Sequence, residues 1–508
     1  MTPNTGQTEA LTRKAVIGSG WSVLANAGRQ ILSLLAVAFL ARKLGPASYG
    51  LMGMAALVTT FLLNFRDLGT AAAIVQRSSV PDRLLCTLFW TNSALGLLLS
   101  LLVIAAAPAA ARFFHQPELS GILRVLAISF CLTSGGIVHN AILQREMAFR
   151  KLAMADLSSA VAAYAVAIPC AFAGLGVWSL VFSNLASSAV LTVLYWAACP
   201  WRPSRRFAAA ELRSIRGFSL NLFASTLINY GSRNADNLVV GRVLGSVPLG
   251  HYQMAYSLML YPLQNISSVL SQVLFPAFSR LQHDNARFRS AYVRSCMLIA
   301  LVTFPVMAGL GVVADPFVRA VLGAKWVPVI TVFQILAPVG LIQSVQSTVG
   351  QIYVAKGRTD WGLRWNLAAF PVVLLSFLIG VRYGVAGVAA GYAIAVIAIL
   401  SYPCLAVAFR IIDLRVSDFA LQFWPQAAIT LAMAVICAAW LHALHAAGVY
   451  HPWICLASTV LVGVVCYAAA MLYIRPAVIV HLEEVIASSG LPVALKLLPV
   501  LRVFAARR

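Results

Sequence analysis

Long apolar stretches recur along the whole chain, and they limit its fold more than any other feature. An α-helix rises about 1.5 Å per residue, so about 20 apolar residues cross a hydrocarbon core about 30 Å thick. Because 61% of the 508 residues are hydrophobic and 10% are charged, one soluble core could not cover them. We therefore predict an all-α polytopic membrane protein of about 14 transmembrane helices, centred near residues 29, 57, 96, 130, 163, 188, 222, 262, 302, 340, 372, 397, 436 and 463.

Basic residues are distributed unevenly between alternate loops. The chain has 37 Lys and Arg against 15 Asp and Glu, and most of the basic residues fall in loops that are inside if the N-terminus is inside. The positive-inside rule then places both termini in the cytoplasm. The first apolar stretch has no small-residue cleavage pattern, so we expect it to stay as an anchor. The net charge of +22 therefore reflects membrane orientation, and we expect no nucleic-acid partner.

One segment of the chain is repeated about 200 residues later. ARKLGPASYGLMGMAA at 41–56 aligns without gaps on GRVLGSVPLGHYQMAY at 241–256. Both segments follow a predicted outward crossing, so the two copies enter the membrane with the same orientation. This match predicts an internal duplication that produces parallel repeats.

A shorter match occurs at nearly the same spacing. GLGVWSLV at 174–181 aligns on GVAGVAAG at 384–391, and Gly387 with Gly391 predicts a close approach of two helix backbones. Chance similarity between small-residue turns is an alternative for this pair alone. Two pairs of matching segments at nearly the same spacing favour duplication over chance.

Duplication defines the predicted organisation, which is two pseudo-symmetric six-helix lobes followed by a C-terminal helix pair. The linker between the lobes contains two prolines and five arginines, which predict an extended start and a short surface helix. The predicted segments are an N-lobe at 1–199, a cytoplasmic linker at 200–217, a C-lobe at 218–412, the helix pair at 413–475, and a cytoplasmic or interfacial tail at 476–508.

The first helix of each predicted lobe carries a polar stripe. Asn26, Arg29 and Gln30 fall on one face of the first span at helical spacing. Arg29 lies about 17 Å from either end of that span, which is too far for its side chain to reach the membrane surface. We expect it to face protein or a water-filled cavity and to be paired or to receive an anion. Interhelical hydrogen bonding is the alternative.

The seventh span repeats the arrangement. Asn229, Arg233 and Asp236 lie on one face, and Arg29 corresponds to Asn229 under a shift of 200. Both lobes therefore direct an arginine-containing stripe from their first helix, and Asp236 is a candidate for binding a coupling ion.

The eighth span is rich in amide and phenol side chains, namely Gln253, Tyr256, Gln264 and Asn265. Amides and phenols exchange hydrogen bonds with sugars, and aromatic faces stack on them. Hydrogen bonds that only hold the bundle together are the alternative interpretation.

Two further charged residues lie near predicted inner ends. Arg66 follows the second span, where a gate or a solvated pair with Asp67 would both fit. Asp156 lies one turn into the fifth span, where it would carry a coupling proton or cation, or cap the helix and pair with Lys151.

The sequence contains none of the catalytic signatures that we sought. No Gly-Lys dipeptide occurs, so a Walker A loop is excluded, and H-E-x-x-H, G-x-S-x-G and G-x-G-x-x-G are absent. The nine cysteines are scattered singly, without a C-x-x-C pair. We predict a protein that is not an enzyme and that uses no cofactor or metal.

The chain resembles the Wzx-type polysaccharide flippases of the multidrug/oligosaccharidyl-lipid/polysaccharide exporter superfamily, in particular the exopolysaccharide and colanic-acid-like branch. The segments that support the resemblance are ARKLGPASYGLMGMA, FRDLGTAAAIVQR, GLGVWSLV and NADNLVVGRVLGSVPLGHYQMAYSLMLYPLQNISSVLSQVLFPAFSRLQ. It implies a MATE-like bundle of fourteen helices and transport of an undecaprenyl-diphosphate-linked sugar repeat across the bacterial inner membrane. Members line a cationic cavity with arginines, and Arg29, Arg66 and Arg233 fit those positions.

The predicted mechanism is alternating access by two lobes, with arginines receiving a lipid diphosphate because the guanidinium fork binds phosphate oxygens bidentately. The expected partners are the lipid-linked oligosaccharide, membrane lipids, a polysaccharide polymerase and export machinery. A MATE-like multidrug antiporter would favour acidic mid-span residues. A transporter of a peptidoglycan intermediate shares the diphosphate and stays open as an alternative. A membrane-embedded glycosyltransferase or polymerase would show a large outer loop.

Overall fold

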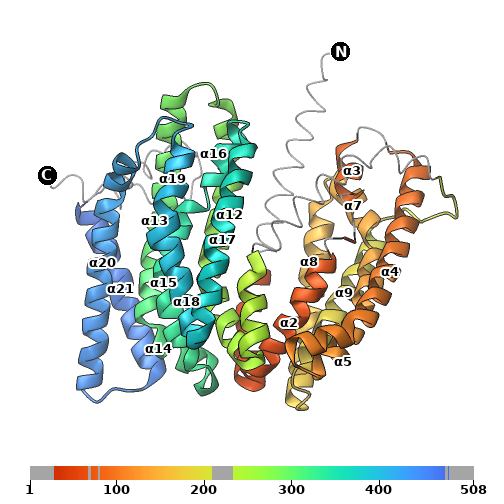
Figure 1. Ribbon diagram of the computed structural model, residues 1–508, viewed down its shortest axis with the longest axis horizontal. Coiled ribbons are helices and arrows are strands. Elements are labelled where there is room, and N and C mark those ends of the chain that lie inside the picture. The colour runs from red at the N-terminus through yellow and green to blue at the C-terminus, as the bar shows by residue number, and fades with distance from the viewer. Residues whose placement is uncertain are drawn as a thin grey trace. The chain divides into compact units, whose positions relative to one another are not determined.

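The computed structural model describes residues 28–63, 65–66, 70–77, 80–208, 233–474 and 479, which are mainly helical and contain no strand. The chain divides into two compact units, Met1–Gly250 and His251–Arg508. Figure 1 shows their helices. The predicted tail at 476–508 and most of the predicted seventh span lie outside the described residues, apart from residue 479 and the residues from 233.

The first unit is a bundle of helices connected by short turns. Residues 28–44 and 233–244 are helical, and the long helices between them run alongside one another in Figure 1. The bounds are α2 (Pro46–Leu63), α3 (Thr70–Gln76), α4 (Asp82–Phe114), α5 (Glu118–Leu126), α6 (Ile128–Ser134), α7 (Ile137–Arg145), α8 (Phe149–Phe172) and α9 (Trp178–Ala198).

The second unit begins inside a helix, because α12 spans Ser246–Arg280 and the unit boundary follows Gly250. Its other α-helices are α13 (Asn285–Val312), α14 (Ala314–Phe317), α15 (Pro328–Gln346), α16 (Val349–Ala355), α17 (Thr359–Gly380), α18 (Gly384–Ile394), α19 (Ser401–Phe409), α20 (Val416–Ala446) and α21 (Pro452–Ile474). Short π or 3-10 segments occur at Val318–Leu322, Ala324–Trp326, Val381–Tyr383 and Ala395–Leu400.

Within the described residues, nine helical segments are long and apolar enough to cross a membrane, or ten if a bent pair is one span. One of the nine, Thr359–Phe409, is 51 residues long and contains both α17 and α18, which fold back on each other. These segments lie at the predicted centres from 57 to 188 and from 302 to 463. The chain is therefore a multi-pass membrane protein, while the total of about fourteen spans also depends on residues outside the described ranges.

The fourth span of each predicted lobe is interrupted, but among the described residues only the interruption in the first unit bends the span by more than 40°. In the first unit, Glu118–Ser134 and Ile137–Arg145 meet at 41°, with Gly135 and Gly136 at the break. In the second unit, Ser347 and Thr348 separate α15 from α16.

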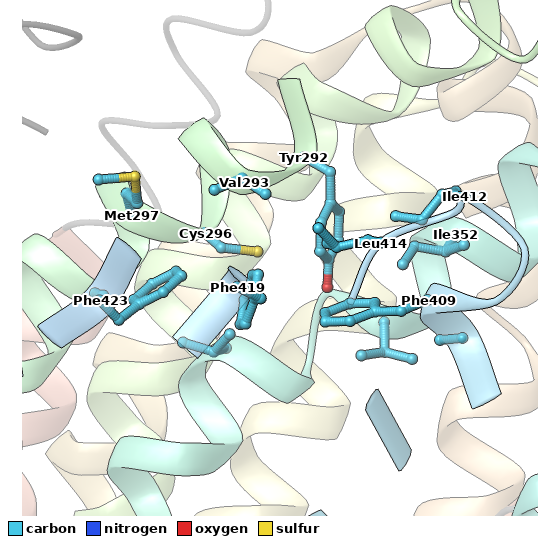
Figure 2. Close-up of a cluster of buried hydrophobic side chains, with 14 of the residues drawn as sticks. Tyr292, Val293, Cys296, Met297, Ile352, Phe409, Ile412, Leu414, Phe419 and Phe423 are labelled. Atoms are coloured by element: carbon cyan, nitrogen blue, oxygen red, sulfur yellow. The ribbon is translucent and has the colours of Figure 1, made fainter. Parts of the chain in front are cut away.

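A large buried aromatic cluster fills one end of the second unit (Figure 2). Tyr292 from α13 lies edge-on to Phe409 with ring centroids 5.9 Å apart. The ring centroids of Phe409 and of Phe419 in α20 are 4.9 Å apart. Tyr292 and Phe409 are fully buried. These contacts tie α20 to α13 and α19 by burial of apolar area.

The predicted close approach of backbones in the second unit is confirmed between α17 and α18. A Cβ atom at Gly391 would lie 2.6 Å from the carbonyl oxygen of Ser376, and one at Gly387 would overlap the carbonyl oxygen of Gly380. Only hydrogen fits at these α-carbons, so the two helices pack in direct backbone contact.

The start of the predicted linker is held on the first unit. Residues 199–208 are not helical, and they lie along the first turns of α4. Trp90 Nε1 donates to the carbonyl of Ser204 at 2.9 Å, and Trp201 Nε1 donates to Asp82 Oδ1 at 2.8 Å. The backbone N–H of Ala208 donates to Thr87 Oγ1 at 3.1 Å. This part of the linker therefore packs as part of the bundle.

Candidate functional site

Four polar side chains from four segments of the first unit form one electrostatic network. The positive charge of Arg29, in residues 28–44, acts on the carboxylate of Asp156 in α8. The Tyr195 hydroxyl in α9 donates a hydrogen bond to Asp156 Oδ1 over 3.4 Å, and the charge of Arg66 acts on Tyr195. We call Arg29, Arg66, Asp156 and Tyr195 the arginine–aspartate cluster.

Packing of the helix at 28–44 along α8 places Arg29 beside Asp156. A Cβ atom on Gly28 would lie 3.9 Å from Leu157 Cδ1, and the rings of Phe39 and Phe172 are 5.4 Å apart. Residue 28 lies near residue 157 and residue 39 lies near residue 172, so residue numbers rise in the same direction along both helices. The two helices are therefore parallel. Arg29 is therefore level with the early turns of α8.

Tyr195 is fixed by the packing of α9 on α8. It is 8% exposed and shares a buried cluster with Ala155, Leu143 and Cys199. Its ring is buried between α8 and α9, and this packing directs its hydroxyl to Asp156.

Arg29 and Asp156 themselves are both exposed. Asp156 belongs to α8, which is apolar and long enough to cross a membrane. A charge exposed at that level is costly in lipid, so these side chains require water, a polar cavity or a charged ligand.

The polar stripe of the first span is only partly within the described residues. Gln30 is half-buried, and Asn26 lies outside the described residues, as does Asn229 of the seventh span. Arg233 is exposed at the start of the described helix 233–244. Asp236 is 4% exposed and accepts the backbone N–H of Asn237 at 2.7 Å, so its carboxylate is engaged within its own helix.

In the second unit, side chains of three helices form an amide and phenol face. Gln343 Nε2 of α15 donates to the hydroxyl of Tyr392 in α18 at 2.5 Å. Tyr256 of α12 lies with its ring centroid 6.4 Å from that of Tyr392 and 5.9 Å from that of Tyr252. We call Tyr256, Gln343 and Tyr392 the phenol–amide face.

The other predicted residues of the eighth span vary in exposure. Gln253 and Asn265 of α12 are half-buried, whereas Gln264 is exposed. Gln253 and Gln264, eleven residues apart, lie on one face of α12, whereas Tyr256 and Asn265, nine residues apart, lie on opposite faces.

Sequence reasoning missed Tyr195 and Tyr392. Each is a single tyrosine in an otherwise apolar or glycine-rich helix, where it is typical of a membrane-interface anchor. Only the packing of α9 on α8 and of α18 on α15 reveals their partners. Among the residues that the structure describes, no group of three His, Cys, Asp or Glu could hold a metal ion.

Comparison with known proteins agrees with this architecture. A family model described as "Polysaccharide biosynthesis protein" matches residues 39–331. The chain is 29% identical to the lipopolysaccharide biosynthesis protein WzxC of Escherichia coli K12 over 77% of this chain and 81% of that protein. It is 28% identical to the teichuronic acid biosynthesis protein TuaB of Bacillus subtilis over 74% and 78% of the two chains. It is 29% identical to the succinoglycan biosynthesis transport protein ExoT of Rhizobium meliloti over 64% and 65%.

Two solved structures share the fold. A lipid II flippase, MurJ, in an inward closed conformation superposes with a TM-score of 0.71, 16% identity, and coverage of 89% of this chain and 98% of that one. An inward-facing MATE family multidrug transporter of the MOP superfamily gives 0.60, 17% identity, and coverage of 78% and 99%.

The fold defines a class of multi-pass helical membrane proteins, and MurJ and a MATE transporter share this fold. Within that class, the chain belongs to the polysaccharide biosynthesis protein family, the Wzx-type group that the sequence resembles.

Proposed function

We propose that this protein is a flippase that moves an undecaprenyl-diphosphate-linked oligosaccharide repeat from the inner to the outer leaflet of the bacterial inner membrane. It would thereby supply exopolysaccharide, capsule or lipopolysaccharide synthesis. Family membership, the relatives named for polysaccharide biosynthesis and transport, and the fold shared with a lipid II flippase all support this function.

The observation that carries the proposal is the arginine–aspartate cluster, whose Asp156 and Tyr195 lie on α8 and α9, two helices long and apolar enough to cross a membrane. Arg29 and Arg66 supply the two cationic groups that a diphosphate needs, and guanidinium forks bind phosphate oxygens bidentately. Asp156 acts as the counter-ion while the site is empty. An arriving diphosphate takes its place beside Arg29, because a doubly charged anion is attracted more strongly than one carboxylate.

Asp156 is also the better of the two coupling-ion candidates. Its carboxylate is exposed and contacts only a phenol among the hydrogen bonds described here, whereas Asp236 is buried and engaged with a backbone N–H. A proton or cation that binds Asp156 would leave the charge of Arg29 available for the cargo.

The phenol–amide face would receive the sugars. Half-buried Tyr256 offers aromatic surface and a hydroxyl, and it packs on buried Tyr392, whose hydroxyl accepts a hydrogen bond from the amide of Gln343. Gln253 and Gln264 extend this polar surface along α12, while the lipid tail would stay in the bilayer.

The proposed architecture is two six-helix lobes, a linker and a terminal helix pair, about fourteen spans in all, with both termini in the cytoplasm and the segment boundaries given above. Backbone conformation supports the duplication. Gly45 and Gly245 have φ of 77° and 90°, and Gly174 and Gly384 have φ of 78° and 73°. The two sequence matches therefore coincide with two pairs of left-handed glycines. Arg233 would be the counterpart of the first lobe's cationic stripe.

The protein would act as a carrier and not as an enzyme. Its other partners would be membrane lipids and the polymerase and export machinery that use the delivered repeat. A peptidoglycan intermediate is the alternative cargo, since it has the same diphosphate. A multidrug substrate fits less well, because the cluster holds two arginines for one aspartate.

Export of surface polysaccharide by cells that depend on this chain tests the proposal. Arg29→Ala should reduce export at least tenfold at equal membrane level and leave lipid-linked repeat units inside. Arg124→Ala, at an exposed arginine of α5, is the matched control and should export normally. Normal export by Arg29→Ala would remove the cluster from the mechanism. Lysis on depletion, without loss of polysaccharide, would indicate the peptidoglycan cargo.

A further inference from the structure

Two glycines of the first unit form a reciprocal backbone contact. A Cβ atom built on Gly50, in α2, would overlap the backbone carbonyl of Ser246. A Cβ atom built on Gly250, in α12, would overlap the backbone carbonyl of Pro46. The first turns of α2 and α12 thus cross with only hydrogen between their backbones.

These four residues are two equivalent pairs in the internal repeat. In the alignment of 41–56 with 241–256, Pro46 corresponds to Ser246 and Gly50 to Gly250. Residue 50 of the first copy meets residue 246 of the second, and residue 250 meets residue 46. Such exchange of partners is the mark of an isologous contact, in which one surface binds its own equivalent about a local two-fold axis. We call Pro46, Gly50, Ser246 and Gly250 the glycine clamp.

The surroundings of the glycine clamp are tightly packed. Leu249 is fully buried, and a Cβ atom on Gly241 would lie 3.2 Å from both Leu249 Cδ2 and Phe114 Cε1. The guanidinium of Arg242 lies 5.2 Å from the ring centroid of Phe113 and donates to the ring of His115. A second-copy segment therefore packs against the end of α4, a helix of the first copy.

The glycine clamp lies at the end of the first unit that the arginine distribution assigns to the outside. Residues 45, 115 and 176 lie in the connections between helices at that end. A Cβ atom on Gly176 would lie 3.9 Å from Ser48 Oγ, next to the glycine clamp. By sequence, residues 241–256 belong to the second copy, yet residues up to Gly250 pack with the first unit. In the proposed alternating-access cycle, cargo would leave on the outside between the two copies, so these contacts would have to part.

We infer that the glycine clamp is the closed outer gate of the carrier, sealed by backbone contact and required to part once in each transport cycle. This inference rests on the proposed function for its cargo, but the gate itself is a property of Gly50 and Gly250. Because neither helix can accept a methyl group there, alanine at either glycine forces the two first turns apart. An alanine variant would therefore keep the outer gate partly open.

Thiol labelling from the outside tests the gate without any transport measurement. Leu249→Cys places a thiol in the buried contact, and a membrane-impermeant maleimide is added to right-side-out vesicles. With both glycines intact, labelling should be slow. Adding Gly50→Ala or Gly250→Ala should raise its rate tenfold or more. Adding Gly350→Ala should not, because a Cβ atom there would meet nothing within 4 Å. The chain without Leu249→Cys corrects for the native cysteines. Equal rates with Gly50→Ala and Gly350→Ala would overturn the gate.

A cross-link keeps the inference testable if the alanine variants fail to accumulate. Ala47 and Val247 are equivalent, exposed residues beside the glycine clamp. Bridging Ala47→Cys and Val247→Cys with a short bis-maleimide should abolish export, whereas either single variant treated alike should export normally. Undiminished export by the bridged protein would show that the contact never parts. Slow labelling and blocked export by these variants, together with normal export by Arg29→Ala, would retain the gate and reject the proposed cargo site.

Discussion

Replacing Thr348 by Val should destabilise the second unit through one buried hydroxyl. Thr348 is 4% exposed and lies at the break between α15 and α16. It donates to the carbonyl of Val345 at 2.7 Å. The hydroxyl of fully buried Tyr292 is 2.9 Å from Thr348 Oγ1, and Cys296 Sγ is 3.4 Å away. Valine keeps the shape of threonine, so the main loss is the acceptor for a buried phenol.

The expected cost follows from that geometry. A buried hydroxyl left without a partner costs about 1–3 kcal/mol. For a unit of this size, 1 kcal/mol corresponds to about 2–4 °C of melting temperature, so Thr348→Val should lower Tm by about 2–12 °C. Tyr292→Phe should cost less, about 1 kcal/mol, because Thr348 still donates to Val345 and no donor is orphaned.

Thermal unfolding of the purified protein in one detergent measures both changes, and the double variant isolates their coupling. In the Tyr292→Phe background, Thr348→Val should be at least about 1 kcal/mol less costly than in the parent, because no phenol remains to be orphaned. An equal cost in both backgrounds would refute the reasoning, since it would assign the loss to the helix break and not to the hydrogen bond.

Three further outcomes are expected. Tyr195→Phe removes the bond to Asp156 and should lower export by up to about tenfold with unchanged protein level; unchanged export would exclude Tyr195 as a positioning residue. Trp90→Phe removes the bond to the Ser204 carbonyl, worth about 1 kcal/mol, and should speed proteolysis of the linker about fivefold; an unchanged rate would mean that the other bonds suffice. Gly391→Ala should destabilise by about 1–3 kcal/mol through overpacking in unfolding assays, and a neutral result would contradict the close contact.

The sequence pattern identified individual residues of the candidate site but not how they interact. The isolated charge of Arg29 in an apolar stretch was sufficient to identify it as a functional candidate, because a cation at such a position must be accounted for. Its neighbour Asp156 was identified separately, as a coupling-ion candidate. That the two act on each other, and that Tyr195 bonds to Asp156, depends on which faces of α8, α9 and the helix at 28–44 meet.

The glycines show the same division. The repeat at 41–56 and 241–256 and the closeness of Gly387 and Gly391 to another backbone were both readable from residue type and spacing. The reciprocal contact of Gly50 and Gly250 was not, because an alignment relates equivalent residues without saying that they touch.

Sequence by itself determined that the chain crosses a membrane many times as helices, since apolar length and the need to satisfy every backbone group in lipid are local constraints. Resemblance of several segments then indicated the family. Tertiary structure decided which polar groups interact and that Gly50 and Gly250 each pack against the other's segment. Those contacts join residues about 40 to 200 positions apart, and no local periodicity encodes which of several similar apolar faces will pack together.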